Sequence, residues 1–124
     1  MLIGGMNNCL PDSDLRKLGS SMLVDFERRV ASIPKDLCAP FHEEARQLET
    51  ELLTIYKMVA LCARKEEDLS GVSKSWGFMV QMCDESAKQL NKLVQQHPSC
   101  GADAYYDRVL DLRNKCHRLQ QMHS

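Results

Sequence analysis

Hydrophobic residues along this chain recur every three or four positions, in four stretches separated by proline, glycine and polar residues. Such spacing places apolar side chains on one face of an α-helix. The clearest stretch runs from position 40 to about 66, and its apolar positions alternate steps of four and three: Phe41, Ala45, Leu48, Leu52, Ile55, Val59 and Cys62. This stretch predicts a long helix with one seam facing a neighbouring helix.

Three further stripes predict three more helices. The first consists of Leu15, Leu18, Met22, Phe26 and Val30, and it stops before Pro34, because a residue that precedes proline avoids helical angles. The third stretch carries Leu69, Val72, Trp76, Met79, Cys83, Ala87, Leu90 and Val94; the fourth carries Tyr105, Val109, Leu112, Cys116 and Leu119. We expect helices over about 12–33, 40–66, 69–97 and 103–122, with Asp103 capping the last.

The connections between these helices are short, which forces successive helices to run antiparallel. No window longer than a few residues alternates with the two-residue period of a strand. The sequence therefore predicts an all-α protein: a flexible tail over 1–11, then one domain over 12–124 that folds as an antiparallel up-and-down four-helix bundle. A three-helix core with a detachable N-terminal helix is the alternative.

Composition narrows the class of partner. The chain has 124 residues, 44% of them hydrophobic and 27% charged, which suits one folded domain and argues against disorder. A formal charge of −1 offers no strong field for a phosphate backbone or an anionic lipid surface. No stretch approaches the roughly 18 apolar residues of a membrane span, and the first ten residues lack a signal-peptide pattern. We expect neither nucleic acid nor membrane as a partner.

The six cysteines are single residues at least 16 positions apart, with no C-x-x-C pair. A chain of this length with long apolar seams does not need disulfides. Cys62, Cys83 and Cys116 also fall on the seams, where cysteine behaves as a small hydrophobic residue. These features predict reduced thiols and an intracellular protein, cytoplasmic or nuclear.

The sequence lacks the motifs of common catalytic, metal-binding and phosphate-binding sites. A di-metal bundle needs Glu-x-x-His on two helices, and this chain has no such motif. His42, His97, His117 and His123 lie near predicted helix ends, without the paired ligands of a zinc site. A phosphate-binding glycine loop and a nucleophile elbow are also missing. We expect a non-enzymatic protein with no catalytic, cofactor or metal site; a metal- or ligand-binding bundle enzyme is the least favoured alternative.

Four apolar residues exceed what one seam per helix requires. Folding the middle hairpin about residue 68 brings two apolar belts to one level, and each belt is wider than a seam. Met58 and Leu61 lie one turn apart on one helix, as do Phe78 and Met82 on the next. They serve either as contacts between core helices or as a docking surface for an amphipathic helix of another protein. We favour an adaptor or small subunit that binds protein through these four residues; self-association as a coiled coil or homodimer is the alternative.

Overall fold

The structure, a computed structural model, describes residues 10–65 and 69–123. Within these ranges it has no strand and four helices: α2 (Asp12–Ala31), α3 (Ala39–Lys65), α4 (Leu69–Gln96) and α5 (Ala102–Met122). Each helix begins within one residue of its expected position and ends within two. Most of the expected tail lies outside the described residues, but Leu10 packs against the core.

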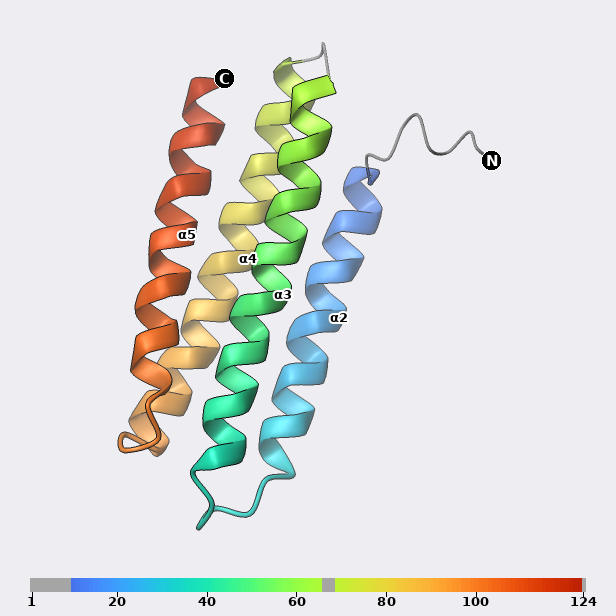
Figure 1. Ribbon diagram of the computed structural model, residues 1–124. Helices are drawn as coiled ribbons and strands as arrows, with labels where there is room; N and C mark the ends of the chain where they lie inside the picture. Colours follow the sequence, from blue (N-terminus) through green and yellow to red (C-terminus); the bar gives the residue numbers. More distant parts are fainter. Residues whose placement is uncertain (1–9, 66–68, 124) are drawn as a thin grey trace.

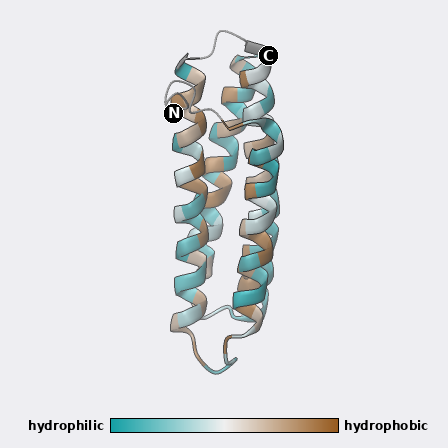
Figure 2. Ribbon diagram, turned by 90° about the vertical axis from the view of Figure 1, so that its right-hand side faces the viewer, coloured by the Kyte–Doolittle hydropathy of each residue, from teal (hydrophilic) through white to brown (hydrophobic). Residues whose placement is uncertain are grey.

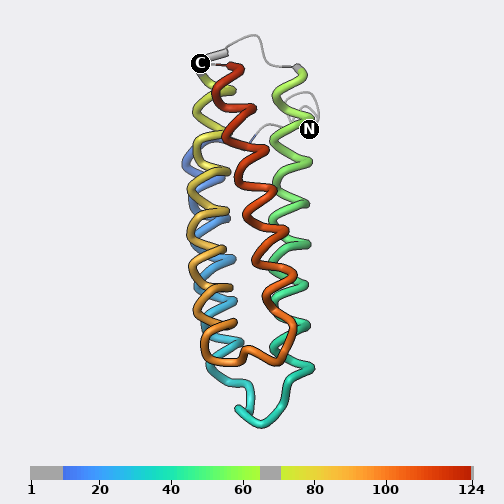
Figure 3. The backbone as a smooth tube through the Cα atoms, turned by 90° about the vertical axis from the view of Figure 1, so that its left-hand side faces the viewer, coloured from blue at the N-terminus to red at the C-terminus, as the bar shows by residue number. Residues whose placement is uncertain are grey.

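The helices alternate in direction along the bundle (Figure 1). The α2–α3 and α4–α5 connections lie together at one end (Figure 3). The prediction of an up-and-down four-helix bundle is therefore confirmed. The first helix packs against α3 and α4, so the structure does not show the alternative with a detached helix.

Side-chain pairs fix which helices are neighbours. The α4 and α5 helices form the most extensive interface, and they run antiparallel, with Arg113 Nε donating to Asp84 at 3.0 Å. The α2 and α4 helices are parallel neighbours, because Asp12 lies 3.9 Å from Lys74 at one end and Glu27 accepts from Gln89 farther along.

The α3 and α5 helices are also parallel neighbours. Tyr105 pairs with His42 near the start of both helices, and the Lys115 ammonium lies 5.1 Å from the centre of the Tyr56 ring farther along. Figure 3 shows α5 flanked by α4 and α3. The α2–α3 hairpin thus lies beside the α4–α5 hairpin, and α3 and α4 meet across the diagonal, where the Tyr56 and Trp76 rings are 5.4 Å apart.

The core is built from the predicted stripes. Trp76, Met79 and Cys83 are buried at the middle of α4, and the regular seam of α3 is buried from Phe41 to Val59. Hydrophobic and hydrophilic positions accordingly recur along each helix (Figure 2). Close packing of these stripes removes apolar surface from water, which is the main force holding the helices together.

Two local predictions are wrong. Leu18 is 38% exposed, and Gly19 takes the buried position beside it, because Met82 of α4 approaches too closely for a larger residue. Asp103 does not cap α5. The helix is instead preceded by Gly101 at φ +79°, a left-handed conformation that glycine adopts without steric cost.

None of the helices within the described ranges is both long enough and apolar enough to cross a membrane.

Candidate functional site

Phe78 and Met82 lie on the side of α4 that faces α2. They line a cavity of about 280 Å³ with Gly19, Leu23 and several polar residues. Met82 is only 5% exposed, and a Cβ atom added to Gly19 would lie 2.9 Å from the Met82 Cε. Phe78 is half-buried, with the Arg16 guanidinium 5.3 Å from the centre of its ring. This pair holds α2 against α4.

Met58 and Leu61 occupy a different environment. Met58 is 36% exposed and borders the buried seam of α3, whereas Leu61 is 56% exposed and lies farther from the seam. Methionine and leucine at i and i+3 form adjoining apolar surface on a helix. The structure therefore separates the four candidates into a largely covered pair on α4 and an open pair on α3. A docking role for either pair stays a prediction.

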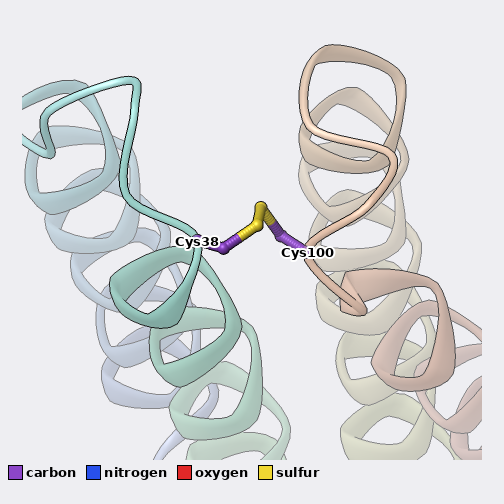
Figure 4. Close-up of a disulfide and its surroundings, with 2 residues drawn as sticks. All are labelled: Cys38 and Cys100. Atoms are coloured by element: carbon purple, nitrogen blue, oxygen red, sulfur yellow. A yellow bond between two sulfur atoms is a disulfide. The ribbon is translucent and has the colours of Figure 1, made fainter.

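The prediction of reduced thiols is wrong for Cys38 and Cys100, which form a disulfide (Figure 4). Cys38 lies in the α2–α3 connection and Cys100 in the α4–α5 connection, 62 positions apart in the sequence with Cα atoms 5.0 Å apart. The prediction is also wrong for Cys62, which was expected as a reduced thiol in the seam of α3 but is half-buried and disulfide-bonded. The bond between Cys38 and Cys100 joins the two hairpins of the bundle at one end.

The directions of the helices explain why Cys38 and Cys100 lie close enough to form a disulfide. Cys38 directly precedes α3, and Cys100 lies two positions before α5. Antiparallel helices bring these two connections to the same end of the bundle, so both sulfurs come within bonding reach. The expected topology together with the two positions would have predicted the pairing.

Aromatic groups surround this end of the bundle. The rings of Phe41 and His97 stack with centroids 3.9 Å apart. The imidazole of His42 meets Tyr105 edge-on, with 3.4 Å between the Tyr105 hydroxyl oxygen and Nε2. Each pair joins α3 to the α4–α5 hairpin, so these contacts and the disulfide hold the same two parts together.

Cys83 and Cys116 are buried free thiols on facing sides of α4 and α5. The hydrogen bond with Cys116, followed by burial, raises the pKa of the Cys83 thiol far above its ordinary value. A thiol in this state is a poor nucleophile, because the reactive form is the thiolate. The prediction that these two cysteines act as small core residues is confirmed.

No group of three or more His, Cys, Asp and Glu residues in the described part of the chain is arranged to hold a metal ion. Some acidic and basic side chains pair within one helix, and others pair between helices, such as Arg29 with Glu44 at 2.9 Å. The pairs of the second kind orient neighbouring helices. None of the protein-family models, curated proteins or solved structures compared with this chain matches it.

Proposed function

We propose that this protein is a non-enzymatic helical module that binds another protein, as an adaptor or a small subunit of a larger assembly. The observation that carries the proposal is the open pair Met58 and Leu61 on α3. The seam of α3 already supplies a continuous row of buried residues to the core without Met58 and Leu61. These two side chains are therefore surplus to the fold and free to contact a partner.

The occupant that best suits this surface is an amphipathic helix. Met58 and Leu61 lie one turn apart, and a helix presents its own apolar residues at the same i, i+3 and i+4 intervals. Methionine adapts to varied partner side chains because its side chain is unbranched and polarizable. Exposed Lys57 and Arg64 border the pair, and they favour acidic residues on the rim of the partner helix.

The disulfide changes the proposed compartment. The expected intracellular location, cytoplasmic or nuclear, rested on reduced thiols, and that reason fails for Cys38 and Cys100. Structural disulfides persist in oxidising compartments and are rare in the cytosol. We therefore place the interaction in an oxidising compartment. Alkylation of free thiols in intact cells tests this: we expect Cys38 and Cys100 to escape, and labelling of both would indicate a reducing compartment.

Photo-cross-linking tests the docking surface directly. A benzophenone side chain is placed at Leu61 in one chain and, as the control, at Thr50 in another. Thr50 is an exposed residue three turns away on the same helix. We expect a discrete adduct from position 61, competed by untagged protein, and none from position 50.

The mass of the adduct separates the two interaction hypotheses. An added mass that matches a different protein supports the adaptor or subunit. An added mass equal to this chain supports self-association as a homodimer. Equal adducts from positions 61 and 50, or none from either, would contradict docking through Met58 and Leu61.

A further inference from the structure

The Cys38–Cys100 disulfide is unsymmetrical in its exposure to solvent. Cys38 is exposed and follows the exposed segment 35–37, whereas Cys100 is 9% exposed. The bond lies between the two connections, just before α3 (Figure 4). A thiolate that exchanges with a disulfide attacks one sulfur in line with the S–S bond, so access decides which sulfur reacts. Access favours the Cys38 Sγ.

Either cysteine can leave as a stabilised thiolate, so access decides between them. Cys38 directly precedes α3 and Cys100 lies two positions before α5, and at both helix starts backbone N–H groups without helical acceptors carry partial positive charge. Thiolates are stabilised near helix N-termini. The Cys100 N–H donates to the His97 carbonyl oxygen at 3.2 Å, which holds the residue in place. A stabilised leaving thiolate speeds thiol–disulfide exchange.

The two free thiols of the described chain cannot supply the attacking group. Cys83 and Cys116 are both buried near the middle of the α4–α5 interface. Cys83 lies 13 residues before the end of α4 at Gln96, which corresponds to roughly 20 Å along the helix. An attack on the disulfide by either thiol would require the bundle to unfold. No free thiol of residues 10–65 and 69–123 can therefore make this attack, and the thiol that we consider is an external one.

We propose that Cys38 is a site of S-thiolation by a low-molecular-weight thiol such as glutathione. The thiolate of the small molecule forms a bond to the Cys38 Sγ as the Cys38–Cys100 bond breaks. The electron pair of that bond leaves with Cys100, whose thiolate then takes a proton from water. One disulfide replaces another, so the exchange itself consumes no further oxidant or reductant.

This exchange has a defined structural effect. The α2–α3 and α4–α5 hairpins lose their covalent link at one end, while the helix interfaces remain. Because packing holds the two Cα atoms close together, 5.0 Å apart in the disulfide, Cys100 can attack the mixed disulfide and expel the small thiol. The modification is therefore reversible, and its extent follows the surrounding ratio of thiol to disulfide.

Peptide mapping of the native full-length chain tests the proposal. The protein is incubated with reduced glutathione without denaturant, quenched with N-ethylmaleimide and mapped by mass spectrometry, while circular dichroism follows helicity. We expect glutathione on Cys38 and maleimide on Cys100, with helicity retained. Glutathione on Cys100, equal labelling of both, or no reaction until helicity is lost would each overturn it.

A matched pair of variants isolates the difference in access. Cys100→Ala leaves Cys38 as the single cysteine of the pair, and Cys38→Ala leaves Cys100. We expect oxidised glutathione to modify Cys38 in the first variant about tenfold faster than Cys100 in the second. Equal rates, or a faster Cys100, would overturn the proposal. If either variant loses its helicity, the mapping of the wild-type chain decides.

Discussion

Gly19 and Gly77 both lie where a methyl group would contact a neighbouring helix, but the neighbours differ. A Cβ atom at Gly19 would lie 2.9, 3.2 and 3.3 Å from three atoms of buried Met82. A Cβ atom at Gly77 would lie 2.9 Å from the Gln120 amide nitrogen, the far end of a half-buried and flexible side chain. The first contact requires a buried side chain to move, whereas the second requires only the free end of a half-buried one to move.

We therefore predict opposite effects for alanine at these two sites. Gly19→Ala lowers the free energy of unfolding by about 1 kcal/mol, because overpacking outweighs the gain in helix propensity. Gly77→Ala raises it by about 0.5–1 kcal/mol, because Gln120 can move aside. Urea denaturation followed by circular dichroism measures both. Stabilisation by both variants would contradict the close α2–α4 contact.

Glu51 and Glu43 give opposite dependences of stability on pH. Burial raises the pKa of Glu51, so its ionised form weakens the fold at neutral pH, and the penalty disappears as the pH falls through that raised value toward 4.5. The hydrogen bond from Arg46 lowers the pKa of Glu43. The ionised form of Glu43 therefore adds stability above pH 4.5, which is lost as the pH falls through the lowered value.

Neutral substitutions test these signs. Glu51→Gln should raise the free energy of unfolding at pH 7, with the difference shrinking to zero near pH 4. Glu43→Gln should lower it slightly at pH 7, and this difference should vanish at still lower pH. Urea denaturation at a series of pH values gives both curves. If Glu51→Gln instead lowers the free energy of unfolding at pH 7, the attraction between Glu51 and Arg29 is larger than the cost of burying the Glu51 carboxylate, which would contradict this prediction.

Among the elements, α2 is the least firmly packed. It contacts α3 and α4 but no described residue of α5. Two clefts, of about 280 and 230 Å³ and open to solvent, lie along its interface with α4. Side chains that line these clefts lack packed neighbours on one side, so we expect this interface to be weaker than the α4–α5 interface.

Amide hydrogen exchange should reveal this difference. We expect amides in the middle of α2, near Met22, to exchange faster than those in the middle of α4 and α5, near Met79 and Val109. Peptide-resolved mass spectrometry of the native protein measures the rates. Equal protection of all three helices would contradict a weak α2–α4 interface.

The helices themselves were accessible from sequence. Pro34 and Pro98 break the hydrophobic periodicity near real helix ends, and the regular seam of α3 left little choice of buried face. The pairing of α2 with α4 could not be predicted from the sequence, because a hydrophobic stripe on one helix does not specify which helix it packs against. For the same reason Leu18 was expected in the core in place of Gly19: the close approach of Met82 is a property of the assembled helices.

The candidate site was predicted only in part. Met58 and Leu61 were recognised as surplus to the seam and are indeed open to solvent. Phe78 and Met82 were grouped with them, but the sequence could not indicate that α2 covers that side of α4. Cysteine spacing alone does not indicate the disulfide, because the bond depends on where the two connections lie in the folded bundle.

At the scale of the whole molecule, the disulfide joins two hairpins that otherwise interact through packing, hydrogen bonds and ion pairs. Cys38→Ala combined with Cys100→Ala should lower the free energy of unfolding by about 2–4 kcal/mol, because the bond closes a long loop in the unfolded chain. Urea denaturation measures the loss, and circular dichroism should show unchanged helicity before the transition. An unchanged midpoint would contradict a stabilising link between the hairpins.

In the proposed function, the whole molecule is a support that presents one side of α3 to a partner. A decisive variant is Met58→Lys with Leu61→Asp, which places charge on that surface and leaves the buried seam residues unchanged. Its matched control is Gln47→Lys with Thr50→Asp. This is an exposed pair with the same spacing and the same introduced charges, three turns away on α3.

The most direct test is the affinity of these two variants and the wild-type chain for the partner identified by cross-linking. We predict that the Met58 and Leu61 variant binds at least about thirtyfold more weakly, as expected when a central apolar contact is lost, and that the control binds like wild type. Equal binding by all three chains, or equal weakening of both variants, would contradict docking through this side of α3.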